Sequence, residues 1–309
     1  MNNRIIRIGS RESVLAVIQS ELVIKEIKRV CPDVETELVT MKTTGDRILN
    51  RSLEQIGGKG LFVKELDRAL LEGRCDLTVH SLKDMPMEVQ EKLPILAYSE
   101  REDKRDVLVL RKGLKALPAS PVIGTFSRRR RMQAARLYPE AVFKGIRGNL
   151  VTRLRKLDDG EYDALILAAA GLLRMGYGER ISRYFTVDEI LPSAGQGIMA
   201  VQGRRDDRNV SFMGLVNSST SQAMAAAERA FVRTLDGGCS SPTAACAEVK
   251  GGRILLKGLY YDEITDRYIT GIAEDALGKE EELGAELALS LRKAFAEGRL
   301  EEDRKINRK

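Results

Sequence analysis

Histidine is nearly absent from this chain, because His80 is the only one among its 309 residues. Imidazole is the usual general base of enzymes and the commonest metal ligand, so a zinc site with several histidines is excluded. A Ser-His or Cys-His catalytic pair would have to use His80 itself. Any chemistry in this chain therefore has to rely on carboxylates, lysine, arginine or cysteine.

Cysteine is also scarce. The four cysteines are Cys31, Cys75, Cys239 and Cys246, and their spacing is too uneven for a disulfide framework. None of them belongs to a C-x-x-C pair of the kind that binds zinc or forms a redox centre. We therefore expect reduced thiols and no metal site.

Long apolar runs are missing as well. The longest, residues 164–173, is about half as long as a membrane-spanning helix. Arg4, Arg7 and Arg11 interrupt the apolar residues near the N-terminus, so no signal-peptide core forms there. Together with the reduced cysteines, these absences predict a cytoplasmic protein that has no membrane partner.

Alternating strand and helix patterns run through most of the chain. In the first part, strands are expected at 4–9, 37–41 and 76–80, with helices after Ser10 as N-cap and at 61–72. A polar connector follows at 100–106.

The second part has expected strands at 107–110, 122–125, 142–146 and 164–168, and helices at 127–137 and 149–158, the latter capped by Asn149. The last part reads as a helix from Ser221, strands at 253–259 and 268–272, and a helix at 281–295. The pattern predicts two similar α/β domains with mostly parallel sheets, followed by a smaller α+β domain.

The segment His80-Ser81-Leu82-Lys83-Asp84 ends a predicted parallel strand. Open α/β sheets present their ligands at this edge. A carboxylate there can act as a general acid or base, or can stabilise a cationic intermediate. On these five residues alone, a surface turn with a local ion pair is the simpler interpretation.

Arginines cluster at two predicted strand-to-helix junctions. Five of them fall within the ten positions from Ser127 to Arg136 with no acid among them, and Arg147-Gly148-Asn149 precedes a second helix. Hydroxyls and free backbone N–H groups at such junctions bind oxyanions, and guanidinium groups add bidentate donors. The pattern favours a ligand with several negative groups over a solvated basic face.

Three glycine-containing segments complete the set. Gly57-Gly58-Lys59-Gly60 is not a Walker A loop, because that loop has Ser or Thr after its Lys and neither Gly60 nor Leu61 is one of them. Gln196 lies between two glycines, where it is well placed to approach a ligand. Cys239 follows Gly237 and Gly238, and an accessible thiolate is both a nucleophile and an attachment point. An incidental surface thiol is an equally good interpretation of that loop by itself.

Seven motifs, taken in order, resemble the porphobilinogen deaminase (hydroxymethylbilane synthase) family along nearly the whole chain. They are Arg11-x-Ser13, the segment from Gly57 to Glu65, Val79 to Asp84, Gly124-Thr125 with its arginine helix, Arg147-Gly148-Asn149, Leu191 to Gly197, and Gly237 to Pro242. The resemblance implies a cytoplasmic monomer with two α/β domains like periplasmic-binding-protein lobes and a C-terminal α+β domain. The implied limits are 1–99 with 198–217, then 100–197, then 218–309, so the chain crosses twice between the first two domains.

The resemblance also implies a transferase reaction. Four porphobilinogen molecules are joined head to tail, each with loss of ammonia, to give hydroxymethylbilane for tetrapyrrole (haem-type) biosynthesis. The chain is extended on a dipyrromethane cofactor that a thioether attaches to Cys239. Asp84 matches the catalytic carboxylate, which holds pyrrole N–H groups and stabilises the cation formed as ammonia leaves.

The resemblance assigns binding roles position by position, with pyrrole acetate and propionate groups as the anions. The implied cofactor-binding residues are Cys239, Lys59, Ser81, Lys83, Asp84, Thr125, Ser127, Arg129, Arg130, Arg147 and Gln196. The implied substrate-binding residues are Arg11, Ser13, Arg153 and Arg174. The sequence departs from the family at Phe126, where a serine is usual, and at Lys104, which replaces a common hinge proline.

Two other classes of protein stay open on composition. The formal charge of +6 and the arginine-rich helices invite a nucleic-acid-binding protein, but an aromatic fraction of 5% and the lack of tryptophan count against stacking on bases. A non-enzymatic solute-binding protein with two α/β lobes is the second alternative. It would lack an export signal here and would leave Cys239 unexplained.

Overall fold

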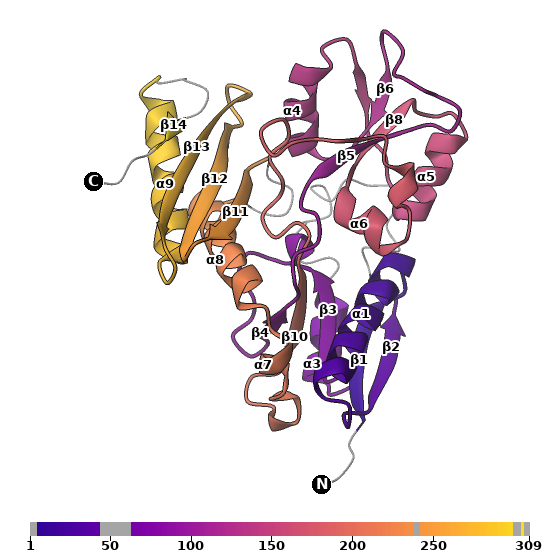
Figure 1. Cartoon of the computed structure of the whole chain (residues 1–309), viewed down its shortest axis with the longest axis vertical. Helices are drawn as coiled ribbons and strands as arrows, with labels where there is room; N and C mark the ends of the chain where they lie inside the picture. The colour runs from indigo at the N-terminus through magenta and orange to yellow at the C-terminus, as the bar shows by residue number, and fades with distance from the viewer. Residues whose placement is uncertain (1–4, 44–62, 238–241, 299–303, 306–309) are drawn as a thin grey trace. The chain divides into compact units, whose positions relative to one another are not determined.

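The computed structural model describes residues 5–43, 63–237, 242–298 and 304–305 (Figure 1). The chain divides into two compact units. Unit 1 comprises Met1–Glu102 and Gly197–Gln222, and unit 2 comprises Asp103–Gln196 and Ala223–Lys309. Within the described part, no helix has the length and apolar character needed to cross a membrane.

Unit 1 is built on a five-stranded sheet with the order β2-β1-β3-β10-β4. Its strands are β1 (Ile6–Arg11), β2 (Thr36–Met41), β3 (Leu77–Ser81), β4 (Ile95–Tyr98) and β10 (Met199–Gly203). The first three run parallel, whereas β10 runs antiparallel to both β3 and β4. The sheet is therefore mixed rather than mostly parallel, because the strand that follows Gly197 enters it in the opposite direction.

Helix α1 (Val14–Val30) covers one face of this sheet, where Val23 and Ile27 pack against Ile8 and Val79. The other helical segments of unit 1 are α3 (Lys64–Leu71), η1 (Leu82–Asp84), η3 (Arg208–Val210) and α7 (Met213–Val216). The N-cap of α1 is Ser13, so the expected cap at Ser10 is wrong. Pairing of β1 with β2 continues to Arg11, which keeps Ser10 buried in the strand.

Gly197 makes a close approach at the first residue of the returning segment. Its carbonyl accepts a hydrogen bond of 3.1 Å from the Glu102 backbone N–H, and its φ is +92°. A Cβ added there would lie 2.3 Å from the Glu102 carbonyl oxygen. The position therefore requires glycine for both its backbone conformation and its space.

We expect Gly197→Ala to lower the free energy of unfolding by about 2 kcal/mol or more, because the backbone has to move and the φ is strained. Chemical denaturation measures the change. Gly214→Ala is the matched control, since a Cβ at Gly214 in α7 meets no atom within 4 Å. A Gly197 variant as stable as the Gly214 variant would show that this approach is not tight in solution.

Unit 2 contains a second five-stranded sheet, with the order β7-β6-β8-β5-β9. Its strands are β5 (Asp106–Leu110), β6 (Val122–Gly124), β7 (Val142–Lys144), β8 (Ala164–Ala168) and β9 (Arg183–Tyr184). Across this sheet, β7, β6 and β8 are parallel, β5 is antiparallel to β8, and β9 pairs with β5 at the edge. The first sheet has the same arrangement of three parallel strands, an antiparallel strand and an edge strand. This shared order confirms the expectation that the second α/β part resembles the first.

Helices cover both faces of this second sheet. Val107 and Val109 of β5 join the cluster with α5 and α6, whereas Leu108 joins the cluster that contains Ala134 of α4. Such alternation is expected where both faces of a strand are buried. The helical segments are α4 (Arg128–Leu137), α5 (Leu150–Asp158), α6 (Ala169–Arg174) and η2 (Gly178–Arg180).

The C-terminal part of unit 2 holds a sheet with the order β11-β12-β13-β14. Its elements are α8 (Ser219–Thr234), which begins at the end of unit 1, then β11 (Ala244–Lys250), β12 (Arg253–Asp262), β13 (Arg267–Ala276), α9 (Glu280–Ala296) and β14 (Arg304–Lys305). The three main strands are antiparallel, and α9 lies along β12 and β13 (Figure 1). The α/β class with an α+β C-terminal part is confirmed, and the three predicted domain limits stay a prediction.

Candidate active site

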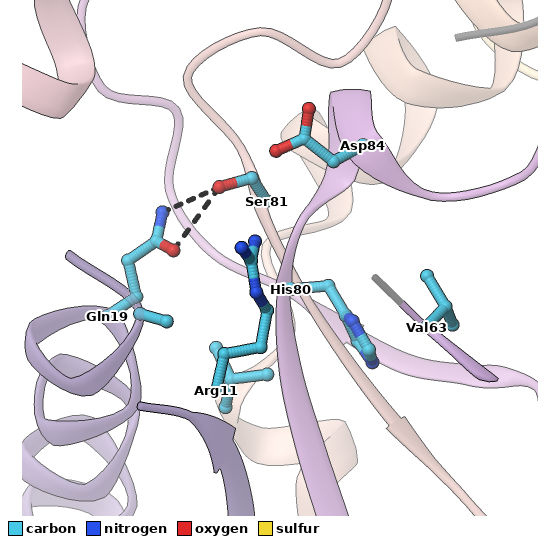
Figure 2. Close-up of a pocket in the computed structure, with 8 residues that line it drawn as sticks. Arg11, Gln19, Val63, His80, Ser81 and Asp84 are labelled. Carbon is cyan, nitrogen blue, oxygen red and sulfur yellow. Dashed lines mark hydrogen bonds between the residues drawn. The ribbon is translucent and has the colours of Figure 1, made fainter. Parts of the chain in front are cut away.

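A small pocket lies at the carboxyl edge of the unit 1 sheet, where β1 and β3 end. Arg11 is the last residue of β1 and Ser81 the last of β3, and both line the pocket with Asp84 of η1. These two strands are parallel neighbours, so their carboxyl ends meet at one edge. In the view of Figure 2, the Arg11 guanidinium and the Asp84 carboxylate lie on either side of the Ser81 hydroxyl.

Hydrogen bonding fixes the polar wall of this pocket. The Gln19 amide of α1 donates to the Ser81 hydroxyl at 2.9 Å, as Figure 2 shows. The Asp84 side chain is exposed and makes no ion pair with any residue that the structure describes. Ser13 forms the N-cap of α1 without using its hydroxyl for the cap. The edge therefore presents a carboxylate, a guanidinium and a hydroxyl that a ligand can reach.

His80 lies in the same wall but is buried in β3. Its Nε2 lies 2.9 Å from the Thr78 hydroxyl. Burial and, to a lesser extent, the nearby Arg11 charge lower the pKa of His80 to about 4, against the opposing effect of a hydrogen bond with Gln202. His80 is therefore neutral at physiological pH and is a buried part of β3, the strand that ends at Ser81 and leads into η1 with Asp84.

We expect the buried His80 to make the protein less stable in acid. The unfolded chain takes up a proton near pH 6.5 while the folded protein does so only near pH 4, so stability falls as the pH drops through this window. The full effect is about 3 kcal/mol in the free energy of unfolding. Denaturation of the native protein and of His80→Gln between pH 7 and 4 measures it. Identical pH slopes for the two proteins would contradict the assignment.

A second polar edge is formed in unit 2, where β6 and β7 end as parallel neighbours. The Thr125 hydroxyl accepts a hydrogen bond from the Ser127 N–H, and the Ser127 hydroxyl accepts one from the Arg130 N–H. The Asn149 side chain caps α5 by accepting from the Thr152 N–H at 2.9 Å, which confirms that predicted cap. Arg153 donates to the Gly148 carbonyl at 2.8 Å.

Arg147 lies at this edge with its guanidinium over an aromatic ring. Its Cζ is 4.4 Å from the centroid of the Phe126 ring. The Nη2 atom of Arg147 is buried and has no hydrogen-bond partner among the described residues. An unpaired buried donor is costly unless a ligand or water satisfies it. Among the predicted anion-binding residues, Arg129 also has a buried donor, Nε, without a hydrogen-bond partner in the described part of the chain, but Arg129 has Asp106 as a counter-charge whereas Arg147 has an aromatic ring.

Asp106 is the functional candidate that sequence reasoning missed. It was expected at the end of a polar connector over 100–106, but it is the first residue of β5 and is fully buried. Arg129 Nη1 donates to Asp106 Oδ2 at 2.7 Å, and Arg130 Nε donates to Asp106 Oδ1 at 2.9 Å. Burial lowers the pKa of Arg129, and the Asp106 charge opposes that shift. One carboxylate thus neutralises part of a buried pair of cations.

Gln196 completes the cluster around Asp106. Its amide donates to Asp106 Oδ1 at 3.1 Å and to the Lys104 carbonyl at 2.7 Å. The side chain is 1% exposed, and its two hydrogen bonds hold the backbone before β5 and the first residue of that strand. A ligand contact of Gln196 stays a prediction.

Two other arginines of α4 are bound by the C-terminal part of unit 2. Arg128 donates to Glu263 at 3.0 Å and lies over the Tyr261 ring, and Arg136 lies over the Tyr268 ring. The anion that the arginine cluster seemed to require is therefore supplied partly by the protein. This changes the expectation for α4, because its charge alone no longer argues for a ligand.

The predicted site residues fall into separate sets. Arg11, Ser81 and Asp84 share the unit 1 pocket, with Ser13 and the half-buried Lys83 in the adjoining turns. Thr125, Ser127, Arg147 and Arg153 share the β6–β7 edge, and Arg129, Arg130 and Gln196 surround Asp106. Arg174 ends α6, the helix after β8. Lys59 and Cys239 lie outside the described residues.

The matching family models and the curated relatives agree on one family. The family described as "Porphobilinogen deaminase, dipyromethane cofactor binding domain" matches residues 6–211, and "Porphobilinogen deaminase, C-terminal domain" matches residues 223–293. The porphobilinogen deaminase of Acetivibrio thermocellus is 52% identical over 93% of this chain and 98% of its own length. That of Ruminiclostridium cellulolyticum is 53% identical over 91% and 96%.

A solved structure, the periplasmic aliphatic sulphonate binding protein SsuA from Escherichia coli, covers 75% of this chain and 70% of its own. Its identity of 12% and TM-score of 0.40 are too low to support an inference. The two family matches span most of the chain in order, and the curated relatives match at more than half of all aligned positions. The chain belongs to the porphobilinogen deaminase family.

Proposed function

We propose that this chain joins four porphobilinogen molecules head to tail, releases one ammonia for each, and yields hydroxymethylbilane. Membership of the family supports this reaction. The observation that carries it is the exposed Asp84 carboxylate beside Arg11 at the carboxyl edge of a parallel strand pair. No histidine is available for the chemistry there, because His80 is buried and neutral.

The chemistry of the donor set fits a dipyrromethane cofactor. That group carries acetate and propionate side chains, and the described residues offer an unsatisfied guanidinium at Arg147 and hydroxyls at Thr125 and Ser127. When bound, the cofactor supplies the pyrrole carbon to which the first substrate is added. We propose that the Cys239 thiol holds it through a thioether and that Lys59 contributes a further cation.

Asp84 is proposed to act on the substrate by electrostatics. The aminomethyl group leaves from its protonated, ammonium form, and ammonia takes the electron pair of the C–N bond, so the positive charge passes from the nitrogen to the substrate carbon and the pyrrole ring. A carboxylate fixed beside the ring stabilises the charge there more than it stabilises the charge on the ammonium group of the ground state, which lowers the barrier. The same carboxylate can accept a hydrogen bond from a pyrrole N–H. Ser81 and Lys83 flank it and are proposed to orient the ligand.

The arginines of the predicted site, together with Ser13 and Gln196, are proposed to bind the carboxylates of the ligands. Arg11 and Ser13 in unit 1, with Arg153 and Arg174 in unit 2, are assigned to the substrate, while Arg147, Arg129, Arg130 and Gln196 are assigned to the cofactor. Guanidinium groups suit this role because they bind carboxylates in a bidentate way. For Arg129 and Arg130, Asp106 shares the charge, so a ligand carboxylate there would need only part of each guanidinium.

Turnover with porphobilinogen tests the proposed function. Purified protein is incubated with porphobilinogen, and ammonia release and substrate consumption are followed together. We expect one ammonia per porphobilinogen consumed and a linear tetrapyrrole as product. Binding of porphobilinogen without ammonia release would instead favour a solute-binding protein.

We further propose that the protein is a cytoplasmic monomer with domain limits at 1–99 with 198–217, 100–197 and 218–309. The two short crossings near Glu102 and Gly197 support the first two limits, because they lie where the compact units divide. Sedimentation analysis of the purified chain tests the monomer, and a dimer mass at micromolar concentration would overturn it.

A further inference from the structure

Phe126 is an exposed aromatic residue beside a predicted anion-binding arginine. It lies between β6 and α4 and is 48% exposed, so it is not part of a core. Its ring nevertheless has two close neighbours, Arg147 and Gly145. The Arg147 Cζ lies 4.4 Å from the ring centroid, within the range of a cation–π contact.

The loop after β7 leaves room for this ring. A Cβ added at Gly145 would lie 3.0 Å from Phe126 Cδ2 and 3.1 Å from Cε2, which is tighter than ordinary packing. The absence of a side chain at Gly145 therefore leaves room for the ring against the loop that carries Arg147. The segment after β6 and the segment after β7 lie side by side here because the two strands pair in parallel and end at the same edge.

The Phe126 ring packs against the guanidinium of Arg147, but one hydrogen-bond donor of that group has no acceptor in the part of the chain that the structure describes. Its Nη2 atom is buried and has no hydrogen-bond partner among the described residues. The stack of Arg105 on Tyr184, at 4.2 Å, is different because Arg105 also pairs with the Asp103 carboxylate at 2.6 Å. At Arg147 an aromatic ring stands where Arg105 has a carboxylate, so the side chain has a packing partner while its Nη2 donor has no hydrogen-bond acceptor among the described residues.

We propose that Phe126 is a positioning residue that stacks on Arg147 and holds its guanidinium ready for a ligand carboxylate. Arginine loses considerable rotamer freedom on binding, and a contact that orders it beforehand lowers that cost. An aromatic ring can do this without neutralising the charge, whereas a carboxylate would compete with the ligand. The inference rests on the proposed function, in which Arg147 binds a pyrrole carboxylate.

Kinetics of Phe126 variants test the proposal. We expect Phe126→Leu to lower kcat/KM for porphobilinogen about two- to five-fold, the factor that a partly exposed cation–π contact provides. Phe126→Tyr should restore the native value because it keeps the ring. Tyr184→Leu is the matched control, since it removes a ring from under Arg105, and we expect no change. In an Arg147→Lys background, Phe126→Leu should have a smaller effect than in the native protein.

A second readout does not depend on turnover. Phenylglyoxal modifies accessible guanidinium groups, and peptide mass spectrometry follows Arg147 alone. We expect Arg147 to react about two- to five-fold faster in Phe126→Leu than in the native protein or Phe126→Tyr, because the ring no longer covers and orders it. Thermal unfolding of each variant identifies any loss of folding.

The outcomes separate the two levels of the proposal. Equal kinetic losses in Phe126→Leu and Phe126→Tyr, or unchanged Arg147 reactivity, would overturn the role of Phe126. An undiminished effect of Phe126→Leu in the Arg147→Lys background would overturn it too. Native protein that releases no ammonia would instead refute the proposed function, while the modification experiment would still decide whether the ring orders Arg147.

Discussion

Replacing Asp84 with asparagine is expected to slow ammonia release from porphobilinogen by a factor of about 10²–10³. Asparagine keeps the size of the side chain and a hydrogen-bond acceptor, but it removes the negative charge that stabilises the cation formed on the substrate. The fold should be unaffected, because the Asp84 side chain is exposed and pairs with no cation among the described residues. Initial rates at saturating substrate, with the free energy of unfolding measured on the same samples, check both statements.

Glu88→Gln is the matched control for Asp84. Glu88 is an exposed carboxylate four residues further along the same segment, so its loss changes the net charge equally. We expect that variant to keep the native rate within about two-fold, because a surface charge away from the reacting carbon is screened by solvent. Similar losses in both variants would show that overall charge, rather than the position of Asp84, governs the rate.

Replacing Asp106 with asparagine is expected to lower the free energy of unfolding by about 3–5 kcal/mol. The substitution leaves the Arg129 and Arg130 guanidinium groups buried without their shared counter-charge. Removing one member of a buried charge network costs much more than removing a surface pair, because the remaining charge cannot reach water. Chemical denaturation at neutral pH measures the loss.

The control for Asp106 is a partly exposed ion pair close to it in sequence. Asp103→Asn removes the partner of Arg105; the Arg105 side chain is 42% exposed and the Asp103 side chain 19%. We expect a loss of about 1 kcal/mol there, because solvent reaches both partners. If the two substitutions cost the same, Asp106 does not neutralise the buried arginines in solution.

Local features of the site were predictable because their signals lie within a few residues. Ser127 and Asn149 were placed at helix starts by their residue type and position, and both cap their helices. The position of Asp84 just after β3 followed from the apolar run before it. Caps and strand ends depend on neighbouring backbone groups, so a single sequence contains most of the information needed.

Features that depend on distant partners were missed or misplaced. Asp106 was assigned to a polar connector, and its contacts with Arg129, Arg130 and Gln196, which lie far away in the sequence, explain its burial. Ser10 was expected to cap α1, but pairing with β2 extends β1 past it. Strands β4 and β10 are short and carry no alternating pattern strong enough to identify them. The stack of Arg147 on Phe126 likewise joins two loops that only the sheet brings together.

The intact mass of the purified native protein tests the central claim most directly. We predict that it exceeds the mass of the sequence by two linked pyrrole units, and that Cys239→Ser has the mass of its sequence alone. This result would establish both the dipyrromethane cofactor and its attachment residue. A native mass equal to that of the sequence, in protein that releases ammonia from porphobilinogen, would contradict the account.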